Sequence, residues 1–270
     1  MHAPEYQFAK DKRQVEAAVR RLNVAYPVVL DNEYKTWDAF ANRYWPTVYL
    51  IDADGYIRFE HHGEGDYEKI EGALRDLVVE LNPHADLPQP LDPLRDEDHV
   101  GAVCFRTTPE LHAGYHRGAL GNAEGYPPRG LPLIYHAPRE RLDGYFYAEG
   151  VWRADEEHLA LAGEHGALVL PYHAATANAV LAPSSDPVDL MLDLKPPLTL
   201  TVTQDGLPLD SFTAGDDNHF AEGRSLLRVD APRSYQIARN PDAAPHELRL
   251  EISATGLAVY AFSFSSCTVS

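Results

Sequence analysis

The stretch YWPTVYLIDADGYIRFEHHGEGDYEKIEGALRDLV, residues 44–78, decides the fold of the first part of the chain. β-Branched and apolar residues at 47–52 predict a buried strand. Asp54-Gly55 predicts a tight hairpin turn, since both central positions of such a turn must accept positive φ, and 56–62 is the returning strand. Residues 67–81 predict a helix with its apolar side chains on one face, and Asp66 is placed to cap that helix.

The sequence before this stretch predicts further helix and strand. Apolar residues recur at helical spacing over 10–22, and a short apolar run at 27–30 predicts a strand. A second helix is expected over 34–44, and Pro46 ends it. The first part of the chain, residues 1–82, is therefore predicted to be an α/β domain.

A proline-rich and acidic segment follows. Residues 82–98, NPHADLPQPLDPLRDED, contain four prolines and no apolar periodicity, so 83–98 is predicted to be a linker. Short strand-like runs then recur at a spacing of about ten residues, which predicts an all-β antiparallel jelly-roll sandwich over 99–270. The expected strands are 144–152, 158–161, 167–172, 188–194, 198–204, 225–229, 234–238, 246–252 and 257–264.

Charge and motifs exclude several classes of protein. The chain has 41 acidic and 23 basic residues and a formal charge of −18, which disfavours binding to nucleic acid. It has neither an apolar run of membrane-spanning length nor an apolar leader segment. The motifs of nucleotide-binding proteins, dehydrogenases and serine hydrolases are absent. So is the Cys-x-x-Cys motif, because Cys104 and Cys267 are the only cysteines.

Residues 44–78, together with MHAPEYQFAKDKRQVEAAVRRLNVAYPVVLDN at 1–32, resemble the C-terminal half of thioredoxin-like proteins. Within that family they are similar to the DipZ-like proteins of cytochrome c biogenesis, whose His-x-Pro-Glu-aromatic motif matches His2, Pro4, Glu5 and Tyr6. The resemblance continues through 108–118, 142–152, 168–181, 203–209, 231–239 and 260–267. It implies a partial thioredoxin-like fold followed by a jelly roll of the carbohydrate-binding-module type.

The resemblance implies a thiol:disulfide oxidoreductase, and it also raises a question about this chain. The family's Cys-x-x-Cys lies before the segment that matches residue 1, so the chain is expected to be redox-inactive alone. One hypothesis is that the natural coding sequence starts further upstream or is split. The other is a truncated domain whose sheet is completed by the second domain, by another chain, or not at all.

Partners and location follow from the same resemblance. It implies a disulfide-containing protein or a membrane thiol transporter as partner, and a location in the periplasm or cell envelope. No cofactor, metal or catalytic residue is expected within this chain. The competing hypothesis is a stand-alone glycan- or partner-binding protein that keeps a non-catalytic thioredoxin remnant.

Pro46 has two interpretations. In the family a cis-proline lies beside the dithiol, and the backbone before it pairs with the substrate peptide. The resemblance therefore implies a substrate edge formed by Trp45, Pro46 and Thr47. The alternative is that Pro46 only ends the preceding helix.

The sandwich offers candidate ligand residues. Carbohydrate sites combine aromatic faces with carboxylates and arginines. The alternative is that most of these aromatic residues belong to the core. The candidates are Tyr145, Tyr147, Trp152, Tyr172, Asp217, Arg233 and Tyr235.

Histidines and acids give only weak metal signals. His112 and His116 would share a helix face, but Gly114 argues against a helix there. The run GDDNHF, residues 215–220, resembles a calcium loop loosely, and a plain polar loop is the favoured interpretation.

Cys104 and Cys267 lie near the first and last strands of the predicted sandwich. In an exported protein they would form a disulfide that closes the domain. The alternative is two buried thiols.

Overall fold

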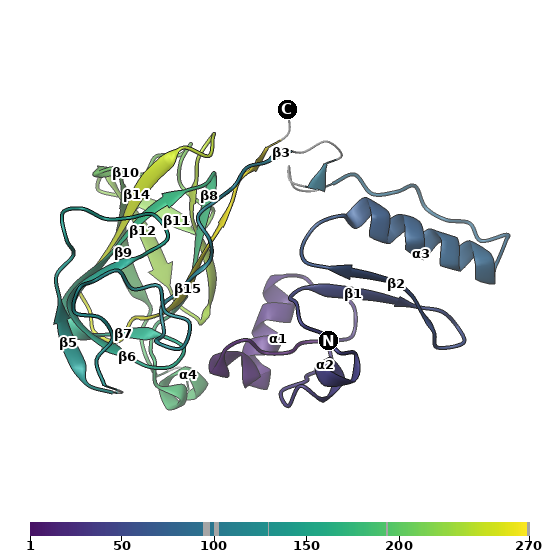
Figure 1. Ribbon diagram of the computed structural model, residues 1–270, viewed down its shortest axis with the longest axis horizontal. Helices are drawn as coiled ribbons and strands as arrows, with labels where there is room; N and C mark the ends of the chain where they lie inside the picture. Colours follow the sequence, from purple (N-terminus) through teal and green to yellow (C-terminus); the bar gives the residue numbers. More distant parts are fainter. Residues whose placement is uncertain (94–97, 100–102, 129, 193, 269–270) are drawn as a thin grey trace. The chain divides into compact units, whose positions relative to one another are not determined.

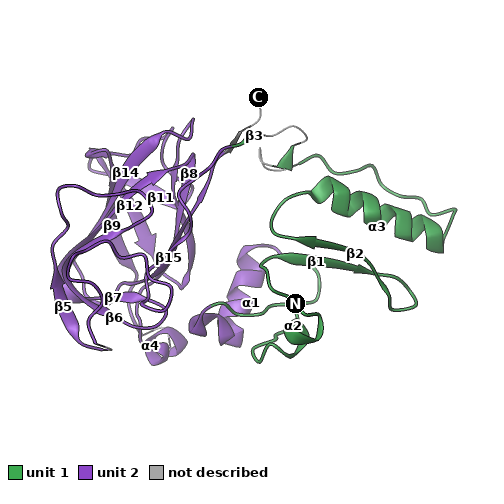
Figure 2. Ribbon diagram, in the orientation of Figure 1, with its two compact units in different colours: residues 1–5, 25–104, 267–270 green, residues 6–24, 105–266 purple. Residues whose placement is uncertain are grey.

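The computed structural model describes residues 1–93, 98–99, 103–128, 130–192 and 194–268, and the chain divides into two compact units (Figure 2). The first unit comprises residues 1–5, 25–104 and 267–270, and the second comprises 6–24 and 105–266. The predicted first domain, 1–82, included 6–24. In the structure this segment belongs to the second unit, because the rings of Tyr6 and Phe8 lie 5.1 and 4.9 Å from the ring of Tyr260.

Among its described residues the first unit contains two helices and two two-stranded antiparallel sheets, one of them a hairpin (Figure 1). Strands β1 (Thr47–Ile51) and β2 (Ile57–His62) form the hairpin, α2 (Lys35–Ala39) precedes it, and α3 (Tyr67–Leu81) follows it. The predicted order of strand, turn, strand and helix is therefore confirmed. Neither α2 nor α3 has a fully buried residue, so the apolar face of α3 remains partly open to solvent.

Several local predictions for this unit are corrected. The helix expected over 34–44 ends at Ala39, because Ala41 takes a left-handed conformation with φ of 50°. The run 27–30 forms only one bridge, between His2 and Leu30. Asp66 does not cap α3 with its side chain, because its own φ is 53° and its carboxylate accepts from Lys69 Nζ at 2.7 Å.

The hairpin turn is organised by a residue that lies before the Asp-Gly pair. Of that pair only Gly55 has a positive φ, of 88°. Oδ1 of Asp52 accepts hydrogen bonds from the backbone N–H groups of Asp54 and Tyr56, at 3.1 and 2.9 Å. The turn is therefore an Asx-stabilised loop rather than the two-residue turn that the sequence predicts.

The predicted linker has no regular structure over its first part. Residues 83–93 form neither helix nor strand, and residues 94–97 of the same prediction lie outside the described residues. Arg75 of α3 donates to the carbonyl of Pro88 at 2.7 Å, which ties this segment to the helix.

The second unit is built on one antiparallel sheet of twelve strands among its described residues (Figure 1). The main path runs β11-β12-β9-β14-β7-β15-β8-β13. Its strands are β7 (Leu159–His173), β8 (Thr176–Ala182), β9 (Leu198–Gln204), β11 (Asn218–Ala221), β12 (Arg224–Val229), β13 (Arg233–Arg239), β14 (Pro245–Ile252) and β15 (Ala258–Ser265); β4 (Leu111–His112), β5 (Pro132–Tyr135), β6 (Tyr147–Ala154) and β10 (Leu207–Pro208) join it off this path.

Alternating side chains explain why the sheet encloses a core. In β9 the side chains of Leu198, Leu200 and Val202 are buried, while the threonines between them are more exposed. Asp205 and Gly206 both have positive φ and form a tight turn to β10. The largest fully buried side chains of the core are Trp152, Tyr135, Tyr172, Tyr235, Phe146 and Phe262.

Two details differ from the predicted strand pattern. The run 188–194 is not a strand: α4 (Pro187–Leu192) forms there, and Asp186 Oδ1 accepts from the N–H of Val188 at 2.8 Å. The runs 158–161 and 167–172 belong to one long strand, β7, which pairs with β6, β14 and β15. The hydrogen-bonded strands thus form one continuous sheet.

The same unit includes an N-terminal helical segment. η1 (Gln7–Lys10) leads into α1 (Lys12–Arg21), which is capped by Asp11 through the N–H of Arg13 at 2.9 Å. No helix of the described residues is long and apolar enough to cross a membrane.

Candidate functional site

The loop at Trp45, Pro46 and Thr47 is exposed but held from several directions. Asn42 Nδ2 and Thr47 Oγ1 both donate to the carbonyl of Tyr44, at 3.2 and 2.9 Å. The indole Nε1 of Trp45 donates to the carbonyl of Ala3 at 3.2 Å. The N–H of Gly63 donates to the carbonyl of Pro46 at 2.8 Å, and the Trp45–Pro46 peptide bond is cis.

The backbone of Trp45 itself is open. Within the part of the chain that the structure describes, neither its N–H nor its C=O makes a hydrogen bond. Its side chain is 50% exposed, and that of Tyr44 is 56% exposed. A fixed loop that leaves one donor and one acceptor of its backbone unused can pair with an extended peptide.

Aromatic rings of α2 and its C-terminal end pack against the Trp45–Thr47 loop and β1. The rings of Trp37 and Trp45 lie 4.3 Å apart, and those of Phe40 and Tyr49 lie 5.0 Å apart. The hydroxyl of Tyr49 donates to Asn42 Oδ1 at 3.3 Å. These contacts connect α2, the loop and β1.

Asp31, which is not among the residues predicted from the sequence, positions Trp37. Its two carboxylate oxygens accept from the N–H groups of Thr36 and Trp37, at 3.1 and 2.8 Å, and the residue is 6% exposed. An aspartate shortly before a helical stretch is the only sequence signal for this role.

The two cysteines do not offer a free thiol among the described residues. Cys104 lies in β3 (Val103–Cys104), is exposed, and is disulfide-bonded. β3 pairs with β16 (Cys267–Thr268), and the backbone of Cys267 lies directly opposite Cys104. The side chain of Cys267 lies outside the described part.

Most of the candidate carbohydrate residues lie in the core of the second unit. Four aromatic side chains, those of Tyr147, Trp152, Tyr172 and Tyr235, are at most 3% exposed, so their faces cannot receive a ligand. Tyr145 precedes β6 and is 44% exposed. The predicted set of aromatic residues is therefore not brought together at the surface.

The remaining two candidates are used within the fold. Arg233 Nη1 lies 2.7 Å from Asp217 Oδ1, and the Arg233 guanidinium stacks over the ring of Tyr235 at 3.7 Å. The other oxygen of Asp217 accepts from the N–H of Gln236 at 2.8 Å. Burial raises the pKa of the Tyr235 hydroxyl to about 12. Asp217, in the run 215–220, thus ties its loop to β13.

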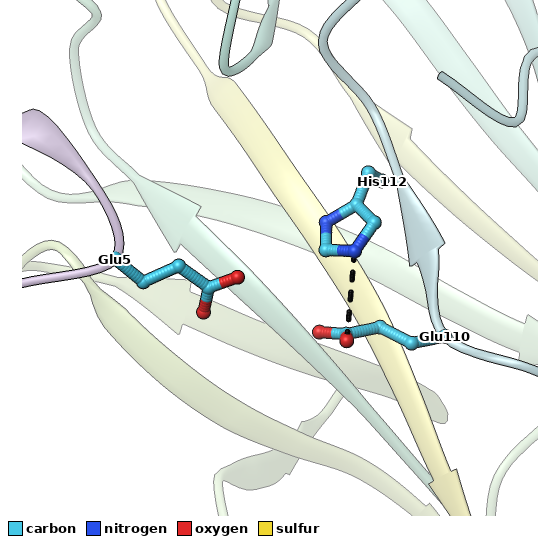
Figure 3. A group of neighbouring side chains, drawn as sticks. All are labelled: Glu5, Glu110 and His112. Atoms are coloured by element: carbon cyan, nitrogen blue, oxygen red, sulfur yellow. Dashed lines mark ion pairs between the residues drawn. The ribbon is translucent and has the colours of Figure 1, made fainter. Parts of the chain in front are cut away.

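The weak metal signals take a different form in the structure. His112 lies in β4 and His116 in a turn, so they do not share a helix face. His112 Nε2 instead forms an ion pair with Glu110 Oε2 at 3.5 Å (Figure 3). Nδ1 of the same ring lies 3.4 Å from the hydroxyl of Tyr6. These contacts tie the segment before α1 to β4.

A cleft of about 320 Å³ lies in the second unit between α1, α4 and the turn at 230–232. Arg13, Gln14 and Lys195 contribute polar groups to it. Its two carboxylates are already engaged: Asp189 accepts from Ser184 Oγ at 2.9 Å, and Asp230 accepts from the Tyr235 hydroxyl at 3.1 Å. No local sequence pattern predicts this cleft, because its walls come from segments far apart in the chain.

Known proteins resemble this chain over nearly its whole length. Protein DipZ of Mycobacterium bovis and that of Mycobacterium tuberculosis are each 29% identical over 264 residues, which is 98% of this chain and 33% of the relative. The chain therefore spans a third of the length of these relatives. NHL repeat-containing protein 2 of Bos taurus is 30% identical over 70 residues, which is 26% of this chain and 10% of that protein.

A family model extends the comparison to the second unit. The model described as the thioredoxin like C-terminal domain matches residues 108–265. This match covers more than half of the chain and nearly all of the twelve-stranded sheet. The protein therefore belongs to the thioredoxin-like C-terminal domain family.

Proposed function

We propose that this chain is the substrate-recognition portion of a DipZ-type thiol:disulfide oxidoreductase, and that the Trp45–Thr47 loop is its peptide-binding edge. The observation that carries the proposal is that the backbone N–H and C=O of Trp45, on an otherwise fixed and exposed loop, have no hydrogen-bond partner among the described residues. The similarity to DipZ over 98% of the chain supports the thiol-redox context.

In this proposal the dithiol chemistry is supplied from outside the 270 residues. Disulfide exchange starts with attack by a thiolate, and the sequence contains no Cys-x-x-Cys. Cys104 is disulfide-bonded and so carries no thiolate. The contribution of this chain is to hold a disulfide-containing polypeptide in an extended conformation, in the periplasm or cell envelope.

Site-specific cross-linking tests the recognition step. Trp45 is replaced by p-benzoylphenylalanine, and the full chain is irradiated with S-alkylated insulin B chain, an unfolded peptide that cannot exchange disulfides. We expect cross-linking at position 45 and little at position 56, where Tyr56 is 70% exposed on the hairpin turn. Equal cross-linking at both positions would contradict the proposal.

An insulin-reduction assay tests the division of labour. The chain alone, with dithiothreitol, is expected to match a variant carrying Cys104→Ser and Cys267→Ser. Activity clearly above that of the variant would show that the chain performs the exchange itself.

A second candidate is a stand-alone module that binds a small ligand or a glycan through the jelly-roll-like unit. The cleft between α1 and α4 favours it, because polar and apolar groups converge there. The burial of four of the predicted aromatic residues argues against a carbohydrate platform. A glycan array distinguishes the two, since only this second candidate expects a signal that survives Trp45→Ala.

A further inference from the structure

Charge is distributed very unevenly between the two units. The first unit, residues 1–5, 25–104 and 267–270, contains 18 acidic and 6 basic side chains, a net formal charge of −12. The second unit accounts for the remaining −6 of the total of −18, although it has about twice as many residues. A single-sign field of this kind attracts oppositely charged partners over several ångströms.

The basic residues of the first unit are mostly occupied. Lys35 pairs with Glu33 at 2.5 Å, and Arg58 pairs with both Asp52 and Glu80 at 3.2 and 3.1 Å. In the same way Lys69 pairs with Asp66 and Arg75 with Glu71. These pairs involve four of the five basic side chains that the structure describes in this unit, and the unit keeps a surplus of carboxylates, with a net formal charge of −12.

Exposed aromatic rings supply a second, independent preference for cations. Trp45 is 50% and Tyr44 is 56% exposed, and we call these two side chains the aromatic loop surface. Trp37 packs against Trp45 at 4.3 Å, which fixes the indole while half of its area stays open. An exposed indole or phenol face attracts an ammonium or guanidinium group, and the attraction is stronger when the contact is desolvated.

We propose that the partner docking on the aromatic loop surface is a cationic polypeptide, an extended segment rich in lysine or arginine. This inference rests on the proposed function, because it names the substrate class of the same loop. The backbone of Trp45 pairs with the main chain of the partner, the rings of Tyr44 and Trp45 receive its cationic side chains, and the carboxylate surplus raises its rate of association.

Fluorescence anisotropy with the unaltered full chain tests the charge preference. Fluorescein-labelled deca-lysine and deca-glutamate are titrated at 50 and 300 mM NaCl. We expect deca-lysine to bind at least tenfold more tightly than deca-glutamate at 50 mM, and its affinity to fall at least tenfold at 300 mM, because salt screens the field. Equal binding of the two peptides would overturn the inference.

Substitution locates the binding. Trp45→Ala is expected to weaken deca-lysine binding about 3- to 30-fold, whereas Tyr56→Ala, which removes a more exposed ring from the same unit, leaves it unchanged. Circular dichroism checks that both variants are folded. If the folded Trp45→Ala variant binds deca-lysine as tightly as the unaltered chain, the peptide is attracted by the net charge of the protein and does not dock on the aromatic loop surface. That result would overturn the inference.

The test of the proposed function does not depend on the outcome of the test of the cationic partner. The alkylated insulin B chain is not lysine-rich, so its cross-linking at position 45 reports recognition of an extended peptide whatever its charge. Cross-linking there together with equal binding of deca-lysine and deca-glutamate would keep the proposed function and discard the cationic partner.

Discussion

The indole rings of Trp37 and Trp45 lie 4.3 Å apart with an interplanar angle of 36°, and this contact joins α2 to the exposed loop before β1. Trp37 is in turn positioned by the carboxylate of Asp31, which accepts from its backbone N–H at 2.8 Å. The orientation of the exposed indole therefore depends on a buried aspartate fourteen positions earlier in the sequence.

Removing that aspartate should loosen the loop. Asp31→Ala leaves two backbone N–H groups of α2 without an acceptor, so we expect a loss of about 1–2 kcal/mol in the free energy of unfolding of the first unit. The near-ultraviolet circular dichroism of the tryptophans should weaken as well. Asp38→Ala is a matched control in the same helix, and an equal effect of both substitutions would contradict the positioning role.

A closed ring of hydrogen bonds inside the second unit should be costly to break. The Tyr172 hydroxyl donates to Gln204, Gln204 donates to Asn240, and Asn240 donates back to Tyr172, all at 2.7–2.8 Å and buried. Asn240→Ala leaves the buried Gln204 amide without its acceptor and removes the hydrogen bond that the Tyr172 hydroxyl accepts, and we expect a loss of about 2–4 kcal/mol.

Urea unfolding measures this loss, and Asp242→Ala, two residues away on the exposed loop, is the control. A change below about 0.5 kcal/mol for Asn240→Ala, the range of ordinary surface substitutions, would mean that the ring adds little to stability.

Acid should destabilise the second unit through His158. Burial beside Tyr260 lowers the pKa of this imidazole below its ordinary value of 6.5, with nearby Asp155 opposing the shift. Below pH 6.5 the imidazole of His158 is protonated in the unfolded chain but still neutral in the folded chain. The free energy of unfolding therefore falls as the pH drops.

The neutral variant His158→Phe should lose this part of the pH dependence. Urea midpoints at pH 7.5, 6.5 and 5.5 compare it with the unaltered chain, and exposed His116→Ala serves as control. Parallel pH profiles for all three proteins would show that His158 is not responsible.

Opening the disulfide bond of Cys104 should destabilise the protein. Cys104→Ser is expected to cost about 2–4 kcal/mol, since a cross-link between distant residues restricts the unfolded chain. In the unaltered chain Ellman's reagent should detect no thiol before unfolding and reduction. Detection of about two thiols per chain in the native, unreduced state would contradict this.

Local patterns predicted a large share of the fold. The alternation of leucine or valine with threonine in 198–204 identified β9, and the periodic apolar residues of 67–81 identified α3. The run 188–194 was mistaken for a strand because Val188, Leu190 and Leu192 alternate with other residues as they would in a sheet. A helix forms there because Asp186 caps its N-terminus and Pro187 is its first residue. The short apolar run that follows makes this start signal easy to overlook.

The candidate site residues were harder to predict, because the burial of each side chain depends on segments that are far from it in the sequence. Tyr145 and Tyr147 share parity in the sequence, yet Tyr145 is 44% exposed and Tyr147 only 3%. The difference arises because Tyr145 precedes β6, whereas Tyr147 lies in the strand and its hydroxyl accepts a hydrogen bond from the N–H of Leu142 at 2.8 Å. No local pattern reports the ring of Tyr172, Gln204 and Asn240, whose members are separated by 32 and 36 positions.

The two ends of the segment 105–266 meet: the N–H of Phe105 donates to the carbonyl of Ser266 at 3.4 Å, and beyond them Cys104 and Cys267 face each other across β3 and β16. A polypeptide that enters and leaves at one point can be spliced into a surface loop of another protein without stretching its host. Residues 104–267 thus begin and end at one point, and transplanting them as one block would keep β3 paired with β16 but would leave out the segment 6–24, which packs on Tyr260.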